Sequence, residues 1–252
     1  MQLLLVFFFL LGALIASFVM VVAERAYTGQ SWKRGRSKCS SCSAELSARD
    51  LIPIFSWVMI RGRCRTCGSR IPVTHIIVEA ALGLLFVLSY EALGIGLPLA
   101  LFLISLSILA FIVLYDLRHT IVPPAASFLF FISALAFALL THEDSAALGL
   151  TVALAGCIAL FLFLLYALSR GRAMGLGDAP IALALALLVG STNAVTGLLF
   201  SFWIGAVVGI AILLVRRGGP TMGIEVPFVP FLAAGFLLAY FTQWNPFPLF
   251  VL

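Results

Sequence analysis

The chain has 252 residues, of which 63% are hydrophobic and only 10% are charged, and its formal net charge is +5. Soluble globular proteins are about 45–50% apolar and about 25% charged, so this composition excludes soluble enzymes, disordered tails and disulfide-stapled secreted domains. A helix needs about 20 residues to cross a bilayer, so the sequence predicts an all-α polytopic membrane protein with little mass outside the membrane. The positive charge then bears on membrane topology and gives no reason to expect nucleic acid as a partner.

Apolar runs separated by polar interruptions predict about eight transmembrane helices, near residues 2–23, 76–96, 97–115, 125–141, 146–169, 179–191, 195–215 and 229–248. The sixth run is short, and Pro246 and Pro248 interrupt the last, so a tilted or half-inserted helix is an alternative for both. A cleavable signal sequence is an alternative for the first run. That run has no basic residue before its apolar stretch and is longer than a typical signal core, so we interpret residues 1–23 as the first transmembrane helix.

Lysine and arginine are confined to alternate loops of this eight-span arrangement. All 15 basic residues fall in the loops 24–75, 116–124, 170–178 and 216–228, whereas the opposite loops carry acidic residues and a histidine but no base. Because basic loops are retained in the cytoplasm, the pattern predicts a multi-pass protein of the cytoplasmic (inner) membrane with both termini outside the cytoplasm.

Residues 24–75 form the only sizeable segment outside the predicted spans, and this segment contains two C-x-x-C motifs. The four cysteines are Cys39, Cys42, Cys64 and Cys67, with 21 residues between the two motifs. Tetrahedral zinc prefers four thiolates presented by two such turns, usually about 15–20 residues apart. A segment of this size is also too small to fold well on an apolar core of its own. The pattern predicts a zinc-knuckle loop with structural zinc, since four cysteines leave no coordination position for water.

Other interpretations of the loop stay open. The thiols of a cytoplasmic loop are reduced, so unliganded or redox-active cysteines are the alternative to zinc. Cys157 lies in the fifth predicted span and is interpreted as a packing residue. The basic residues around the cysteines either contact anionic lipid headgroups or serve only as the topology signal.

Two aspartates stand at the same predicted membrane face. Asp116 directly follows the third apolar run, and Asp178 ends the sequence Gly175-Leu176-Gly177-Asp178 before the sixth. Each has an ordinary interpretation: Asp178 as the N-cap of the sixth helix, with Pro180 in its first turn, and Asp116 as a solvated residue near Arg118. An acid at a membrane boundary is nevertheless a functional candidate.

The two aspartates together predict a specific chemistry. Two carboxylates that meet cannot both ionise cheaply, so they share a proton. One then acts as a base on a water molecule while the other donates to the scissile carbonyl. We therefore predict aspartic-protease chemistry with Asp116 and Asp178 as catalytic residues. Gly175 and Gly177 would support the site by letting the backbone approach a substrate or leave helical geometry.

The ordered set of motifs resembles the prepilin peptidases, the type 4 prepilin leader peptidases of the GxGD aspartic protease family. The resemblance covers nearly the whole chain. Its motifs are the two C-x-x-C pairs, Ile52-Pro53-Ile54-Phe55-Ser56-Trp57, Arg61-Gly62-Arg63-Cys64, Val78-Glu79, the aspartate followed by a proline, the G-x-G-D stretch, and Pro227-Phe228-Val229-Pro230-Phe231.

The resemblance implies that leaders of type IV prepilins or pseudopilins are cleaved at the cytoplasmic membrane face by Asp116 and Asp178. It also implies that the cysteine-bearing loop 24–75 goes with members that N-methylate the new amino terminus using S-adenosylmethionine, and that residues 76–252 form the membrane-embedded peptidase domain. The expected partners are these substrates and membrane lipids, without nucleic acid.

Three positions depart from the family's pattern. Pro124 stands where relatives usually carry an acid or amide, Pro180 where they carry a lysine, and Met20 where many carry an asparagine. None of these changes removes a catalytic aspartate. They leave open a peptidase without methyltransferase activity.

Three other functions are alternatives. A presenilin-like intramembrane protease also pairs Tyr-Asp with G-x-G-D, but the chain lacks the P-A-L motif of that class. A proton- or cation-coupled transporter would carry ionisable groups near mid-membrane, and here Glu79 is the only acid expected a few residues inside a span, with the stretch from Glu91 interpreted as a turn. The intact aspartates argue against an inactive scaffold.

Overall fold

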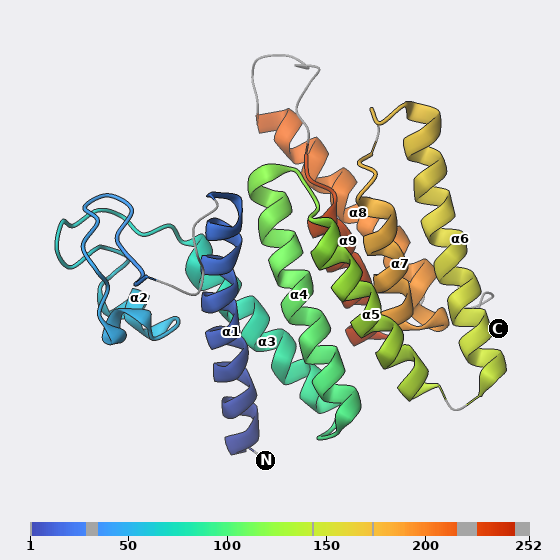
Figure 1. Cartoon of the computed structure of the whole chain (residues 1–252), viewed down its shortest axis with the longest axis horizontal. Coiled ribbons are helices and arrows are strands. Elements are labelled where there is room, and N and C mark those ends of the chain that lie inside the picture. Colours follow the sequence, from blue (N-terminus) through green and yellow to red (C-terminus); the bar gives the residue numbers. More distant parts are fainter. Residues whose placement is uncertain (1, 29–34, 143, 173, 216–225, 245–252) are drawn as a thin grey trace. The chain divides into compact units, whose positions relative to one another are not determined.

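The computed structural model describes residues 2–28, 35–142, 144–172, 174–215 and 226–244. Regular structure in this part of the chain is helical, without an extended strand (Figure 1). Six helices are long and apolar enough to cross a membrane: α1 (Gln2–Thr28), α3 (Thr74–Leu93), α4 (Leu97–His119), α5 (Pro124–Thr141), α6 (Ser145–Ser169) and α8 (Ser191–Val215). The shorter helices are η1 (Ala48–Leu51), α2 (Phe55–Met59), α7 (Asp178–Val189) and α9 (Val229–Thr242).

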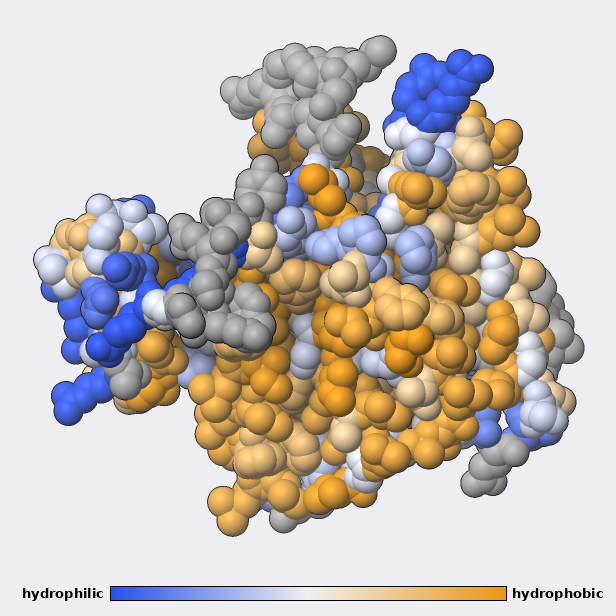
Figure 2. Space-filling model, in the orientation of Figure 1, coloured by the Kyte–Doolittle hydropathy of each residue, from blue (hydrophilic) through white to orange (hydrophobic). Residues whose placement is uncertain are grey.

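The predicted all-α, multi-pass membrane protein is confirmed, and an apolar helix lies at each of the eight predicted runs. The sixth run becomes α7, which has only 12 residues. The last run becomes α9, which ends at Thr242, and Pro246 and Pro248 lie outside the described residues. Eight full crossings therefore stay a prediction. Many large apolar side chains of the long helices are exposed, and Figure 2 shows hydrophobic side chains over much of the helical surface, as expected for contact with lipid.

The chain divides into two compact units, Met1–Leu99 and Ala100–Leu252. In the first unit, α1 packs against α3, and two glycines allow a close approach. A Cβ on Gly12 would lie 2.7 Å from the carbonyl oxygen of Leu82, and a Cβ on Gly83 would lie 2.9 Å from that of Phe9. Small residues at such contacts are typical of helices that pack within membranes.

In the second unit, α7 is the central helix and packs against α5, α6, α8 and α9. Ten of its 12 residues are buried, so its apolar sequence is surrounded by protein on all sides. Helices α8 and α9 pack closely where Gly197 contacts Phe236 and Gly235 contacts Ser201. This packing places the first residue of α7, Asp178, inside the unit.

Candidate active site and candidate metal centre

Asp116 lies in the last turn of α4, and only 4% of its surface is exposed. The backbone N–H of Val229, the first residue of α9, donates a hydrogen bond to its carboxyl group. This amide is available because the first N–H groups of a helix have no partner within the helix. The Oδ2 atom of Asp116 is buried and has no hydrogen-bond partner among the described residues. Asp116 is thus a buried acid, and the interpretation of a solvated boundary residue is wrong.

Asp178 is the first residue of α7, and 5% of its surface is exposed. Its Oδ2 atom accepts a hydrogen bond of 3.0 Å from the backbone N–H of Gly175. The N-cap position belongs to Gly177, so the interpretation of Asp178 as an ordinary N-cap is also wrong. The carboxyl groups of Asp178 and Asp116 are close enough to interact electrostatically. The fold of the second unit therefore brings together two acids that are 62 positions apart in the sequence.

The contact between two loops holds the aspartates near each other. Helix α4 ends where the N–H of Thr120 donates to the carbonyl of Asp116, and the chain then passes through Val122 into α5. A Cβ added to Gly177 would lie 2.7 Å from the Cβ of Val122, so only a glycine fits there. Neither Gly175 nor Gly177 has a positive φ. Gly175 contributes a hydrogen-bond donor, and Gly177 contributes the space for Val122.

Sequence reasoning assigned no role to Val122 or Val229. The position of Val229 had a signal in the sequence, because Pro230 is typical of the first turn of a helix, where backbone N–H groups are unpaired. The sequence carries no comparable signal for Val122, because its contact with Gly177 depends on how two distant loops meet. Both carboxyl groups are buried, and the Oδ2 atom of Asp116 has no described hydrogen-bond partner. Such a pair can activate a water molecule by acid–base catalysis.

The four predicted zinc ligands form a cluster in the first unit. The sulfur atoms of Cys39, Cys42, Cys64 and Cys67 all lie within 4.8 Å of one another, and those of Cys39 and Cys67 are 3.9 Å apart. Zn–S bonds of about 2.3 Å correspond to about 3.8 Å between the sulfurs of a regular tetrahedron. The donor set and the spacing therefore fit one tetrahedral metal ion.

The two C-x-x-C turns have the same backbone geometry, 25 residues apart. The N–H of Cys39 donates to the carbonyl of Ala44, as that of Cys64 donates to Ser69, at 2.9 Å in both turns. The residue after the second cysteine has a positive φ in both turns: 58° at Ser43 and 71° at Gly68. Two equivalent turns that present their thiols to one point are the arrangement expected of a structural zinc site.

The electrostatics of Cys39 favour the form of the thiol that binds metal. Hydrogen bonds from the backbone N–H groups of Cys42 and Ser41, together with the Ser69 hydroxyl, lower the pKa of the half-buried Cys39 thiol to about 6. Thiolate is the metal-binding form of cysteine. The turn therefore supplies a ligand that is already deprotonated at neutral pH.

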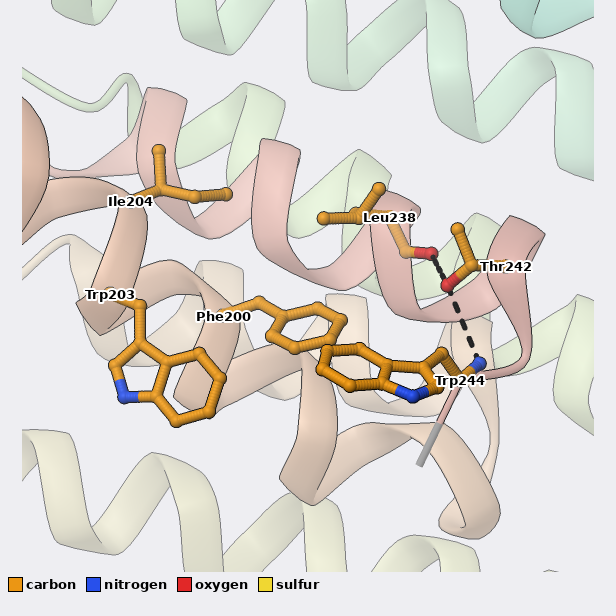
Figure 3. Close-up of a pocket in the computed structure, with 6 residues that line it drawn as sticks. All are labelled: Phe200, Trp203, Ile204, Leu238, Thr242 and Trp244. Carbon is orange, nitrogen blue, oxygen red and sulfur yellow. Dashed lines mark hydrogen bonds between the residues drawn. The ribbon is translucent and has the colours of Figure 1, made fainter. Parts of the chain in front are cut away.

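An apolar groove of about 410 Å³ lies between α8 and α9, lined by Phe200, Trp203, Ile204, Leu238, Thr242 and Trp244 (Figure 3). The Trp244 ring stacks on Phe200 with centroids 5.5 Å apart. None of the six side chains is titratable. Leu238 and Thr242 are in the last turns of α9, whereas the amide that contacts Asp116 is at its start, so this groove is separate from the aspartates.

Known families match both units of the chain. The family described as the bacterial peptidase A24 N-terminal domain matches residues 10–93, and the type IV leader peptidase family matches residues 101–210. The first match lies within the first compact unit and the second within the second. No solved structure is significantly similar to the chain.

Three relatives share the name prepilin leader peptidase/N-methyltransferase. That of Bacillus subtilis (strain 168) is 32% identical over 233 residues, which cover 92% of each chain. That of Myxococcus xanthus (strain DK1622) is 33% identical, over 85% of this chain and 65% of the relative. That of Legionella pneumophila is 29% identical, over 82% of this chain and 72% of the relative.

Proposed function

The chain belongs to the type IV leader peptidase family, and on that premise we propose that it is a membrane aspartic endopeptidase for the leaders of type IV prepilins or pseudopilins. The observation that carries this proposal is the convergence of Asp116 and Asp178, two buried carboxyl groups that interact within the second unit. The basic loops of the sequence support cleavage at the cytoplasmic face of the inner membrane.

The different partners of the two acids support a division of labour. Oδ2 of Asp178 already accepts the Gly175 amide, whereas Oδ2 of Asp116 has no described partner. We assign Asp116 as the base that takes a proton from water, and Asp178 as the acid that protonates the scissile carbonyl oxygen. The hydroxide adds to the carbonyl carbon and gives a gem-diol. Its C–N bond then breaks as the leaving nitrogen takes the proton from Asp116 and one hydroxyl group of the gem-diol returns a proton to Asp178.

A bound zinc ion would be held by Cys39, Cys42, Cys64 and Cys67. Zinc with four thiolate ligands supplies no hydrolytic chemistry, and its role is to cross-link the two turns of loop 24–75. We place the peptidase chemistry in residues 76–252 and treat the loop as a separate, methyltransferase-associated region. Methylation of the new amino terminus from S-adenosylmethionine rests on the names of the relatives and not on a site in this chain.

The direct test is co-expression of the full-length protein with a candidate prepilin, followed by intact-mass measurement of the product. Asp116→Asn and Asp178→Asn should each lower the cleavage rate by about 10²–10⁴-fold, because each removes a group that moves a proton. The matched control is Thr151→Val, which removes a partly buried hydrogen bond of 3.0 Å between the buried Thr151 and His142 Nε2 and leaves the aspartates unchanged. Full processing by Asp178→Asn would refute the proposal.

The same mass spectrum separates the two proposed activities. A product that lacks the leader and carries one extra methyl group shows a bifunctional enzyme. A product that lacks the leader without that methyl group shows a peptidase alone.

A further inference from the structure

The segment from Leu51 to Met59 exposes apolar side chains although it lies outside the spanning helices. Its exposed large hydrophobic side chains are Leu51, Ile52, Phe55, Val58 and Met59, with exposed fractions between 43% and 63%. In water such a cluster is unfavourable, and it marks a surface that contacts a partner or a membrane. Phe55, Val58 and Met59 belong to α2, and Leu51 and Ile52 precede it; we call these five side chains the apolar face of α2.

Two hydrogen bonds attach this segment to α3 and to the loop that precedes it. The backbone N–H of Ile54 donates a 2.7 Å hydrogen bond to Oε2 of Glu79, which is buried with 6% of its surface exposed. The indole N–H of Trp57 donates to the carbonyl of Ile71 at 3.4 Å. Ile54 adopts a φ of 62°, an unfavourable value for a β-branched residue.

This attachment gives the apolar face its depth relative to the bilayer. Glu79 comes five residues after Thr74, the first residue of the apolar, span-length helix α3, which corresponds to about 7.5 Å along the axis. A segment bonded there lies beside the first turns of a spanning helix and not out in bulk water. Interfacial helices sit at this level, about 5–10 Å into the boundary between headgroups and acyl chains.

The charges on both sides of the segment fit anionic lipid. Arg49 precedes the apolar face, and Arg61 and Arg63 follow it, and all three are exposed. None of the three forms an ion pair within the part of the chain that the structure describes. Arg65 differs, because it pairs with Asp50 at 2.7 Å. Elements that bind an anionic membrane surface typically combine an apolar face with nearby arginine or lysine side chains.

We propose that residues 51–59 are an interfacial membrane-binding element. The apolar face of α2 inserts into the leaflet that α3 enters, and Arg49, Arg61 and Arg63 contact lipid phosphates. The element thereby connects the cysteine loop to the bilayer surface. This proposal depends on membrane insertion of α3 and not on the peptidase activity.

The experiment uses the full-length protein with a photo-crosslinking amino acid at Phe55 or Met59, reconstituted into nanodiscs. The matched control position is Thr66, an exposed residue of the same loop at the tip of the second cysteine turn. Mass spectrometry should show lipid adducts at positions 55 and 59 and none at 66. In discs with anionic lipid, Arg61→Gln should lower the yield at position 59 by up to about fivefold, since one arginine near the surface contributes about 1 kcal/mol.

Three outcomes would overturn the proposal. Equal lipid adducts at positions 66 and 59 would mean that residues 51–59 contact lipid no more than the rest of the loop does. No adduct at either position would mean that the segment does not lie at the membrane surface. If a prepilin added before irradiation replaces lipid as the crosslinked partner at positions 55 and 59, the face is a substrate-binding surface instead. The crosslinking measurement is made in the Asp178→Asn background, in which no cleavage is expected. A negative crosslinking result therefore counts against the membrane-binding element and not against the proposed peptidase function.

Discussion

The side chain of Val122 occupies the space beside Gly177, so that a Cβ at position 177 would lie 2.7 Å from the Cβ of Val122. Both residues are close in sequence to a catalytic candidate: Val122 follows Asp116 by six positions, and Gly177 directly precedes Asp178. The contact therefore fixes how closely the loop before α7 approaches the segment that follows α4.

Gly177→Ala should lower peptidase activity by about a hundredfold. The added methyl group pushes the loop before α7 away from Val122, and misplacement of a catalytic group by about 1 Å has an effect of this size. The rate of prepilin cleavage in membranes measures this loss of activity.

Gly175→Ala and the double variant are the controls for that prediction. A Cβ on Gly175 would lie 3.5 Å from Oδ2 of Asp178, an ordinary contact, so this variant should keep most of its activity. Val122→Gly combined with Gly177→Ala should recover activity, because it removes the Cβ and both methyl groups of Val122 that the new methyl group would meet. An equal loss in both glycine variants would contradict this account.

Zinc should copurify with the protein at about one ion per chain, because the four sulfurs fit one tetrahedral ion. Cys39→Ser should lose the ion, whereas Cys157→Ser should keep it, since Cys157 lies in α6 outside the cluster. Elemental analysis gives the metal content. Freely alkylated cysteines without metal in the unaltered protein would show that the cluster is a set of reduced thiols.

Substitutions at Gly68 and Ser43, the equivalent positions of the two cysteine turns, should change zinc retention in opposite directions. Gly68 has a φ of 71° with open space around it, so Gly68→Ala should weaken the turn by about 1–2 kcal/mol through backbone strain alone. Ser43→Gly should strengthen the other turn, where a serine has a φ of 58°. Competition with a chelator measures both effects as zinc retention, and the same direction of change for both variants would be inconsistent with equivalent turns.

Glu79→Ala should destabilise the first unit by about 1–3 kcal/mol, because it leaves the backbone N–H of Ile54 without its acceptor. Glu79→Gln keeps an acceptor oxygen and should therefore destabilise the first unit less than Glu79→Ala does. Limited proteolysis of the loop between α1 and α3 is a direct measurement, with cleavage expected to be faster in the alanine variant. Equal protection of all three proteins would show that this hydrogen bond does not hold the loop.

The all-α membrane fold and the positions of most helices could be predicted from the sequence, because apolar runs of span length have few other stable structures. The cysteine cluster was also predictable, since each C-x-x-C turn forms locally and four thiolates need only one point of convergence. Predicted boundaries were less accurate: α1 extends to Thr28 instead of residue 23, and α8 begins at Ser191 instead of 195.

The sequence by itself determined what kinds of residue are present at the site: two acids at the ends of apolar runs, glycines before the second acid, and a proline that begins α9. Only the tertiary structure decided that both acids are buried, that the amides of Gly175 and Val229 are their donors, and that Gly177 makes room for Val122. The physical reason is that span length and turn geometry are local properties of the chain. Burial, electrostatic interaction and close packing depend on which distant helices meet.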